Sequence, residues 1–465
     1  MEAETKEFNS KIKTKNSFTN RLSYSLGGFL DNFFSAAFTV RVISYYEDEI
    51  LLPIILVSLS FVIYGLWNMF NDPLIGFFTD QNTKITRRWG RRFPWYMIAV
   101  IPFAIFYLLI FTVPFYNTIL IFLWLLFCIC LFDFFYSLWD TSWLALFPEK
   151  FRSNKERINV AGIATICGQV GIACGMLIPP LFIIYGNRTS FIISASVVVF
   201  IGIIVAILMI PGMFESKKIK ELNEKLVKKK DKGDSFFHNL KIALKQKNFL
   251  VYIFVYLSQM VLWMLVLGSL YYWVRYILKM EAEVEIYISA AFLLGSVISV
   301  PFWVFVGLRL GNRRVYIIGS LSTAICFIPL LFISDLISTM IGAALLGFSI
   351  GALFTLMYPT FSDVIDEIVL KTGKRNEGMY TGIRTFFGRT SNIIGAIVFA
   401  VVHTFTAYQP GASYQIPLAL WGIRVIMVLI PMTFYLISFL LVWKIYDLTP
   451  EKVQNNQSEL KTIKL

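Results

Sequence analysis

The sequence predicts an all-α polytopic membrane protein with twelve transmembrane helices arranged as two parallel-repeated six-helix halves. Three observations support this prediction. The chain of 465 residues is 57% hydrophobic and only 15% charged, whereas soluble domains are about 25% charged. Apolar stretches of ~20 residues, long enough to cross ~30 Å of hydrocarbon, recur along the whole chain. Lysine and arginine gather in alternate connections between these stretches.

The apolar stretches give the expected helices in order. Each has the length of a membrane span, and several contain glycine or proline, which membrane helices use for close packing and bending. The first half is expected to contain helices over residues 22–46, 52–79, 94–115, 118–147, 158–185 and 190–213. The second half is expected to contain helices over residues 249–278, 284–308, 315–333, 336–369, 377–407 and 416–445.

The connecting segments set the expected domain organisation. We expect an N-terminal tail over 1–21, a six-helix half over 22–213, a charged linker over 214–247, a second half over 248–446 and a C-terminal tail over 447–465. Lysines alternate with glutamates in the linker, which is typical of a solvated amphipathic helix. The linker therefore separates two membrane domains of similar size.

The basic residues predict the orientation in the membrane. Most of the 42 lysines and arginines lie in the tails, in the linker and in the loops 80–93, 149–157, 309–314 and 371–376. Twelve spans place all these segments on one side, and basic loops stay in the cytoplasm. We therefore expect a multi-pass protein of the cell membrane with both termini in the cytoplasm. The net charge of +13 is spread over many loops, which argues against a nucleic-acid partner. The expected surroundings are a lipid bilayer, and the expected state is a monomer.

Cysteine and histidine give no support for an enzyme. The five cysteines lie inside apolar stretches, where cysteine acts as a small packing residue. The two histidines are His238 in the linker and His403 near the end of a predicted helix, with no acid within four residues. A histidine-built metal site or a catalytic dyad is therefore not expected. We expect no cofactor other than a coupling ion, H⁺ or Na⁺.

The two halves also resemble each other in sequence. Pro73 followed by Gly90-Arg91-Arg92 is matched by Pro301 followed by Gly311-Asn312-Arg313-Arg314. Residues 148–168 are likewise matched by residues 366–388. Two parallel-repeated six-helix halves joined by a long linker form the plan of the major facilitator superfamily, whose substrate sites lie between the repeats.

Charged residues inside the predicted helices are the candidate functional residues. The acids of the first half are Asp31, Asp72, Asp133 and Asp140, and the bases well inside the second half include Arg384 and Arg389. A carboxylate inside a membrane helix costs about 2.5–3.5 kcal/mol on insertion scales, so it usually faces a polar cavity. Acids in one half and bases in the other predict ion pairs between the halves. Among them, Asp133 and Arg384 are expected to act as gating residues or as an ion-pair latch.

Trp143 is the aromatic residue that we single out as a substrate contact. It lies close to one helical turn beyond Asp140, and an aromatic face beside a carboxylate is a common way to hold a sugar ring. Trp139 shares the same helix face and could serve instead. The alternative for either tryptophan is a packing role or a place in an interfacial aromatic belt.

Three segments together resemble a known family. They are Asn71-Asp72-Pro73-Leu74-Ile75-Gly76, Trp89-Gly90-Arg91-Arg92-Phe93-Pro94-Trp95, and Asp363-Val364-Ile365-Asp366-Glu367 with Thr372-Gly373-Lys374-Arg375-Asn376-Glu377-Gly378-Met379-Tyr380. In these segments the chain resembles the glycoside–pentoside–hexuronide:cation symporters, the melibiose-permease-like branch of the major facilitator superfamily. The resemblance extends from Leu22 to about Trp443. It implies cation-coupled symport of a glycoside or related polar solute by alternating access.

The resemblance also implies roles for individual residues. Asp31 and Asp140 match acids that bind the sugar, and Arg389 falls on the position of a lysine in the eleventh helix. Asp72 matches an acid that binds the coupling cation, and Ser137 falls where a hydroxyl residue assists that cation. A sodium site at Asp72 is therefore one expectation for the coupling ion.

The chain departs from the family pattern at three places. Asn68 replaces the first of two acids in the second helix, which removes one negative charge and favours protons over sodium. Leu144 stands where the stacking tryptophan is expected, and the fifth helix lacks an arginine between Ile158 and Gly175. A galactoside is therefore not implied as the substrate. The alternative is a transporter of lysophospholipids or other amphipathic solutes with the same fold.

Overall fold

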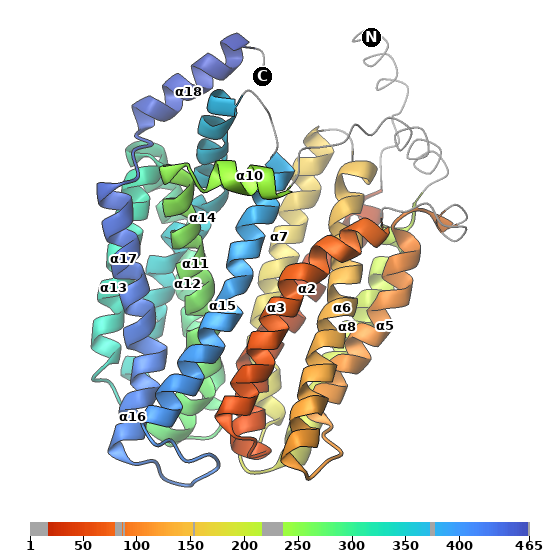
Figure 1. Ribbon diagram of the computed structural model, residues 1–465, viewed down its shortest axis with the longest axis vertical. Helices are drawn as coiled ribbons and strands as arrows, with labels where there is room; N and C mark the ends of the chain where they lie inside the picture. Colours follow the sequence, from red (N-terminus) through yellow and green to blue (C-terminus); the bar gives the residue numbers. More distant parts are fainter. Residues whose placement is uncertain are drawn as a thin grey trace.

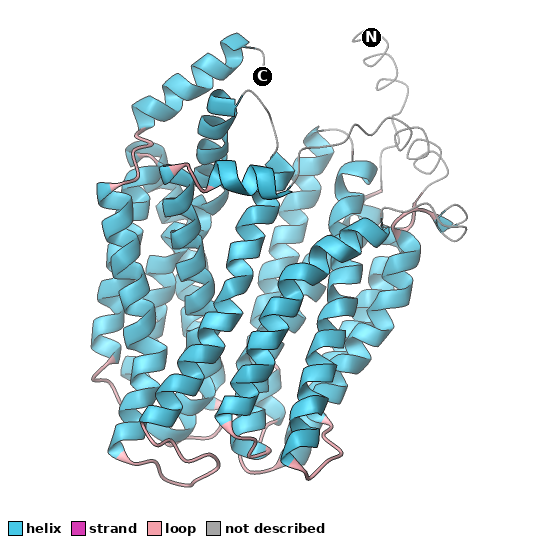
Figure 2. Ribbon diagram, in the orientation of Figure 1, coloured by secondary structure: helices cyan, strands magenta, loops and turns pink. Residues whose placement is uncertain are grey.

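The computed structural model describes residues 17–79, 86, 89–151, 154–215, 236–372 and 377–463. Within these ranges every regular element is helical, as Figure 2 shows. The all-α prediction is therefore confirmed. Residues 216–235, which make up most of the predicted linker, lie outside the described residues, and so does the first part of the N-terminal tail.

The long helices form two groups that run side by side (Figure 1). The first half contains α2 (Phe18–Ser44), α3 (Ile54–Thr79), α5 (Phe93–Phe111), α6 (Thr118–Lys150), α7 (Asn154–Leu177) and α8 (Arg188–Met213). The second half contains α11 (Lys247–Tyr272), α12 (Val284–Leu310), α13 (Asn312–Leu330), α14 (Leu336–Thr372), α15 (Glu377–Phe405) and α16 (Pro417–Arg424) continuing to α17 (Ile430–Lys444).

Twelve spans are present in this arrangement. Eleven helical stretches of the described chain are long and apolar enough to cross a membrane. The twelfth is α2, whose 27 residues reach ~40 Å at 1.5 Å per residue. Asp31 and Asn32 lie at the middle of α2 and lower its apolar character. The polar middle of this helix is the first structural sign of a site inside the membrane.

The two ends of the bundle differ in charge, and we name them accordingly. The basic end is where α3 ends at Thr79 and α5 begins at Phe93, and the acidic end carries Glu47, Asp48 and Glu49. Two further helices lie at the basic end, α10 (Phe236–Ala243) and α18 (Pro450–Ile463), as Figure 1 shows. Helix α18 occupies most of the segment that the sequence pattern described only as a tail.

Each half is tied together at the basic end by its own polar contacts. In the first half, the buried carboxylate of Glu215 accepts hydrogen bonds from the backbone N–H groups of Arg91 (3.0 Å), Arg92 (2.6 Å) and Phe93 (3.2 Å). A carboxylate at this place satisfies the unpaired donors of the α5 N-terminus and the positive end of its dipole. It also fastens the end of α8 to the start of α5.

The corresponding contacts of the second half involve α18. The Asn248 amide donates to Glu367 and to Asp447, each at 2.7 Å. The Lys452 ammonium group donates to the same two carboxylates, at 3.0 Å and 2.8 Å. These bonds hold α11, α14 and α18 together at the basic end of the second half.

The first helix of each half ends in the same irregular way. Helix α2 continues into the π-helical segment η1 (Tyr45–Glu49), and α11 continues into the π-helical segment η3 (Trp273–Leu278). Such segments are rare and often occur at functional sites. Their matched positions agree with a repeat of six helices, and both lie at the acidic end.

Within the first half, α2 and α7 approach each other too closely for a side chain at Gly171. A Cβ atom at Gly171 would lie 2.5 Å from the backbone oxygen and 2.9 Å from the Cα of Phe29. Both are backbone atoms of α2, so neither can move aside without shifting the helix. In contrast, a Cβ at Gly162 on the same helix would have no atom within 4 Å.

These two glycines give a matched prediction for stability. Gly171→Ala is expected to lower the thermal unfolding midpoint in detergent, because overpacking costs about 1–3 kcal/mol. Gly162→Ala is expected to leave the midpoint unchanged or to raise it, because alanine is favoured over glycine in a helix by up to about 1 kcal/mol. Equal shifts in the two variants would contradict the close contact of α2 and α7.

Candidate functional site

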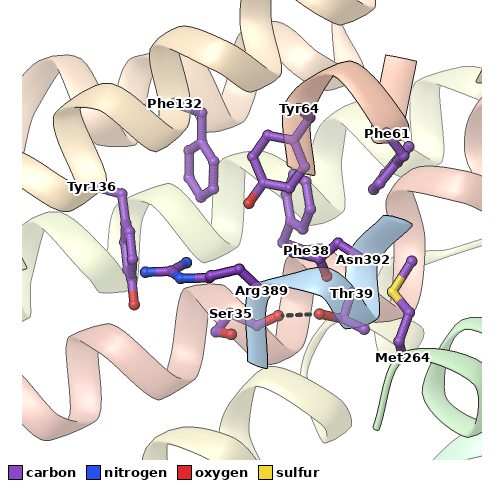
Figure 3. Close-up of a pocket in the computed structure, with 10 residues that line it drawn as sticks. All are labelled: Ser35, Phe38, Thr39, Phe61, Tyr64, Phe132, Tyr136, Met264, Arg389 and Asn392. Carbon is purple, nitrogen blue, oxygen red and sulfur yellow. Dashed lines mark hydrogen bonds between the residues drawn. The ribbon is translucent and has the colours of Figure 1, made fainter. Parts of the chain in front are cut away.

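A pocket lies between the two halves, near the middle of five helices. It contains about 580 Å³ of space not filled by atoms, and this volume includes the open solvent at its mouth. Helices α2, α3 and α6 of the first half and α11 and α15 of the second half form its walls (Figure 3). The lining residues are Ser35, Phe38, Thr39, Phe61, Tyr64, Phe132, Tyr136, Met264, Arg389 and Asn392.

The walls combine aromatic rings with a few polar groups. Phe38 and Phe132 are stacked, with ring centroids 5.2 Å apart and planes within 5°. The guanidinium group of Arg389 extends toward Tyr136, as Figure 3 shows. Aromatic faces with a small number of directional polar groups are typical of sites for polar organic solutes. The lining therefore offers aromatic faces to a ring and hydrogen-bonding groups to its polar substituents.

Asp31, Tyr136 and Arg389 are brought together from three different helices. The Tyr136 hydroxyl donates a hydrogen bond to the Asp31 carboxylate. The charge of Arg389 acts on both of these groups. The two residues Asp31 and Arg389, predicted as substrate contacts from separate halves, thus meet at the pocket through Tyr136. Tyr136 was not predicted as a site residue, although it lies between Asp133 and Asp140 in the sequence.

Asp140 and Trp143 lie beyond Tyr136 on α6. The charge of Asp140 acts on Tyr136 and on Tyr24 of α2. The Trp143 indole N–H donates to the backbone oxygen of Tyr24 at 3.0 Å, and its ring covers Gly27. Only 8% of Trp143 is exposed. In this conformation Trp143 packs α6 against α2, so stacking on a substrate stays a prediction.

The predicted cation residues lie between α3 and α6. The Asn68 amide of α3 donates to the carboxylate of Asp133 on α6, and Asn71 donates to the same carboxylate at 3.0 Å. Ser137 is buried on α6, one turn from Asp133. Asp72 lies on α3, but its side chain is outside the described part of the molecule. Its role in coupling therefore stays a prediction.

Arg384 is enclosed by aromatic side chains of its own half. Its guanidinium group donates to the Tyr252 hydroxyl at 3.4 Å and lies 5.1 Å from the ring centre of Tyr256 and 4.9 Å from that of Phe361. The described hydrogen bonds of Asp133 likewise lead to α3, within the first half. The contacts described for Arg384 and Asp133 thus lie within their own halves, and a latch formed by these two residues stays a prediction.

The acidic end contains a polar cluster that the sequence pattern did not predict. Glu47, Asp48 and Glu49 of η1 are only 0%, 3% and 5% exposed. We call these three residues the acidic cluster. Most of its partners come from the second half, and the backbone N–H of Gly186 in the first half also donates to Glu49 at 3.1 Å. From the second half, Tyr272 (2.5 Å) and His403 (2.7 Å) bond to Glu47, Tyr276 (2.5 Å) and Tyr408 (2.7 Å) to Asp48, and Tyr271 (2.9 Å) and Arg275 (3.0 Å) to Glu49.

A buried ion pair reinforces the acidic cluster. The guanidinium group of Arg41 donates two hydrogen bonds to Glu285, at 3.0 Å and 2.7 Å, and the Tyr185 hydroxyl donates a third at 2.9 Å. Arg41 and Glu285 are 1% and 0% exposed. The prediction placed acids in the first half and bases in the second. In this ion pair the base, Arg41, belongs to the first half and the acid, Glu285, to the second.

These contacts close the pocket toward the acidic end. The side-chain hydrogen bonds described between the halves gather there, ~12 Å beyond Thr39 along α2 at 1.5 Å per residue.

The sequence signal for this cluster is the run of three acids at a helix end, together with Arg41, Arg275 and Glu285 inside or beside apolar stretches. His403 was dismissed for lack of a nearby acid, yet its partner Glu47 is 356 residues away in the chain.

The Arg41–Glu285 pair gives a prediction about closure. Glu285→Gln is expected to favour opening at the acidic end, because breaking a buried pair costs about 3–5 kcal/mol when the remaining charge stays buried. A cysteine introduced as Ser35→Cys in the pocket reports the change through a membrane-impermeant thiol reagent applied from each side in turn. Labelling from the acidic side should rise. Glu281→Gln, an exposed residue of the same region, is the control, and equal labelling in both variants would contradict the prediction.

The acidic cluster also predicts a pH dependence. Burial, together with the charge of Glu47, raises the pKa of Asp48 to about 6, against the opposing effects of Tyr276, Arg275 and Tyr408. An opened and hydrated Asp48 returns toward its usual lower pKa, so the closed form binds the proton more strongly. Closure is therefore favoured as the pH falls below about 6, and this contribution is lost as the pH rises through that value.

Labelling of the Ser35→Cys reporter from the acidic side measures this effect. Labelling from the acidic side should be weaker at about pH 5 than at about pH 7.5. Part of this decrease comes from the lower ionisation of the thiol itself. The Asp48→Asn variant lacks the titrating carboxylate and shows that part alone, so the wild-type background should show a larger decrease than the variant. The prediction fails when the two proteins show the same pH profile.

Comparisons with known proteins agree with this architecture. Residues 23–450 match the family described as "MFS/sugar transport protein". The chain is 24% identical to the sodium-dependent lysophosphatidylcholine symporter 1 of Xenopus tropicalis, over 97% of this chain and 91% of that protein. It is 22% identical to the glucuronide carrier protein homolog of Escherichia coli (strain K12), over 93% of each. It is also 22% identical to the isoprimeverose transporter of Lactiplantibacillus pentosus, over 84% and 81% of the two chains.

Solved structures show the same fold at low sequence identity. A D-xylose-proton symporter superimposes with a TM-score of 0.67 at 12% identity, over 92% of this chain and 98% of that chain. A nucleoside transporter superimposes with a TM-score of 0.62, also at 12% identity, over 91% and 99% of the two chains. The chain therefore belongs to the MFS/sugar transport protein family, the melibiose-permease-like branch that its motifs resemble, and it is a membrane symporter of the major facilitator superfamily rather than an enzyme.

Proposed function

We propose that this symporter moves a glycoside or a related polar solute together with a monovalent cation, by alternating access of the pocket between its halves. The observation that carries the proposal is the meeting of Asp31, Tyr136 and Arg389 at a pocket shared by five helices. A carboxylate, a hydroxyl and a guanidinium group offer acceptors and donors to the hydroxyls or carboxylate of a sugar derivative. The names of the glucuronide and isoprimeverose relatives support this substrate class.

Three residues have distinct proposed roles toward the solute. The Asp31 carboxylate accepts from solute hydroxyls, and Arg389 donates to solute oxygens from the opposite half. Asp140 contributes from the next turn of α6 after Tyr136. A solute held by both halves at once would favour the conformations in which the halves are close, which is how binding can drive the exchange between open states.

The coupling cation is proposed to bind between α3 and α6. Asp72, Asn68 and Ser137 are the residues assigned to this role from the family resemblance. Because Asn68 replaces a carboxylate, we propose protons as the coupling ion in preference to sodium. The basic end is proposed to face the cytoplasm and the acidic end the outside of the cell membrane, in accordance with the distribution of basic residues. The two units that move against each other are residues 22–213 and 248–446.

A second candidate substrate is a lysophospholipid or another amphipathic solute. Two observations favour it. The lysophosphatidylcholine symporter of Xenopus tropicalis matches 97% of this chain. A second cavity, mainly in the second half, is lined almost entirely by apolar side chains, among them Trp263, Phe292 and Met427. Such a cavity could receive an acyl chain, whereas the Asp31 and Arg389 pocket fits a polar ring.

Uptake by proteoliposomes distinguishes these candidates. Labelled glucuronides, pentosides and lysophosphatidylcholine are offered in parallel, under an inward proton gradient or an inward sodium gradient at fixed pH. The proposal expects accumulation of a sugar derivative that a protonophore abolishes. Accumulation of lysophosphatidylcholine alone would establish the second candidate, and accumulation driven only by sodium would overturn the choice of ion.

Substrate affinity should depend strongly on Asp31. A hydrogen bond to a charged group contributes about 1.5–3 kcal/mol, so Asp31→Asn is expected to weaken binding of the transported solute ~10-fold or more. Asp335→Asn is the control, because Asp335 is exposed and caps α14 through Ser338, which asparagine can also do. Direct binding to the purified proteins measures both. Unchanged affinity in Asp31→Asn would place the solute elsewhere.

A further inference from the structure

Asp133 is a buried carboxylate held by neutral amides in the middle of the membrane domain. It lies near the centre of α6, which has 33 residues, and only 1% of it is exposed. The amide groups of Asn68 and Asn71 on α3 donate to its two carboxylate oxygens. Asn68 stands at the position where an acid was expected from the family resemblance. The acid is therefore present at this contact, but on the opposite helix.

Asn68, and Ser137 one helical turn from Asp133 on α6, each have a buried oxygen atom with no hydrogen-bond partner among the described residues. These atoms are Oδ1 of Asn68 and Oγ of Ser137. Both residues are at least nine-tenths buried, with exposures of 0% and 2%. Leaving a buried polar atom unpaired costs about 1–3 kcal/mol, so each such atom calls for an explanation, of which a bound ion is one. Carboxylate, amide and hydroxyl oxygens are the groups that hard cations prefer.

We propose that Asp133 is the carboxylate that takes up the coupling cation, with Asn68 and Ser137 as its neutral partners. This inference rests on the proposed cation-coupled function and assigns the carrying group within it. The ligand class is a small monovalent cation that neutralises one carboxylate. A proton binds covalently to an oxygen of Asp133, and a sodium ion binds to the carboxylate together with Asn68 Oδ1 and Ser137 Oγ.

The Asn68 amide can serve both states of Asp133. When the carboxylate is ionised, the amide N–H of Asn68 donates to it, as the structure shows. When Asp133 is protonated, rotation of the amide by half a turn presents Oδ1 as the acceptor for the Asp133 O–H. The hydrogen bond between the two side chains is then kept, and Asp133 no longer carries a charge. Asn71 can remain a donor to the second oxygen in both states.

A purely structural role does not explain why residue 133 is an ionisable aspartate. Helices α3 and α6 could be joined at this point by amides and hydroxyls alone, without burying a carboxylate. An ionisable group inside a membrane domain is costly and is usually retained for transport. The direct bond between Asn68 and Asp133 has a further consequence: moving the carboxylate from residue 133 to residue 68 displaces the charge by only about one hydrogen-bond length.

Relocation of the carboxylate is the decisive experiment. Wild type, Asp133→Asn and the double variant Asp133→Asn with Asn68→Asp are reconstituted, and both gradient-driven accumulation and solute exchange without a gradient are measured. We expect Asp133→Asn to lose accumulation to the level of equilibration while exchange continues. We expect the double variant to regain at least part of the accumulation. Asp335→Asn is again the matched control, and thermal unfolding midpoints show that each variant is folded.

The outcomes separate this inference from the proposed function. If wild type accumulates no solute under either gradient, the proposed function fails. If wild type accumulates solute and Asp133→Asn does so equally well, the assignment of Asp133 is overturned while the proposed function stands. Loss in Asp133→Asn without any recovery in the folded double variant also overturns it, because a structural role predicts that result.

Ser137→Ala then identifies the cation. If sodium binds at this place, the loss of one oxygen ligand should raise the sodium concentration for half-maximal uptake by ~10-fold. If a proton binds to Asp133, the pH dependence of uptake should be unchanged. Either result agrees with Asp133 as the carrier, whereas a sodium requirement that shifts in Ser137→Ala but not in Asp133→Asn contradicts it.

Discussion

The burial of Glu47, Asp48 and Glu49 between the halves is the constraint on which the closed conformation depends. Three adjacent carboxylates are tolerated away from water because they are hydrogen-bonded, mainly by hydroxyl, imidazole and guanidinium groups of the second half. If the halves separated, water would replace these hydrogen-bond partners. At intermediate separations the carboxylates would reach neither the side chains of the second half nor enough water. The halves are therefore expected to be either fully closed or fully open at this end. The matched π-helical segments η1 and η3 supply both sides of this contact.

The rigidity of each half complements this switch. Gly171 lets α2 and α7 touch backbone to backbone, and Glu215 fastens α8 to α5 at the other end of the first half. The second half is tied by the bonds of Lys452 and Asn248. The pocket lies between these two tied halves. A solute bound by both Asp31 and Arg389, as proposed, would therefore contact both of them.

The fold could be predicted from the sequence, and so could two of the charged residues that lie at or beside the pocket. Apolar length, alternating basic loops and the repeat predict twelve spans because membrane insertion leaves few alternatives. Asp31 and Arg389 stand out in the sequence because a charge in an apolar helix is conspicuous. The acidic cluster was missed because its meaning comes from partners such as His403, 356 residues from Glu47. The contact of Asn68 with Asp133 depends on the rotation of α3 against α6, which no local pattern specifies. The sequence likewise does not show that the Trp143 indole N–H donates to the α2 backbone, because that contact also joins two helices.

The depth of Asp133 has an electrical consequence. A carboxylate near the centre of a membrane-spanning helix lies within the voltage drop across the bilayer, where one elementary charge crossing fully changes its energy by about 2.3 kcal/mol per 100 mV. If this group is ionised when empty and neutral when loaded, the empty protein carries one more negative charge in the voltage drop than the loaded protein does. An inside-negative potential then favours the outward-facing pocket more strongly in the empty protein than in the loaded one. The membrane potential would thus set the direction of transport even where the concentrations of the coupling ion are equal on both sides.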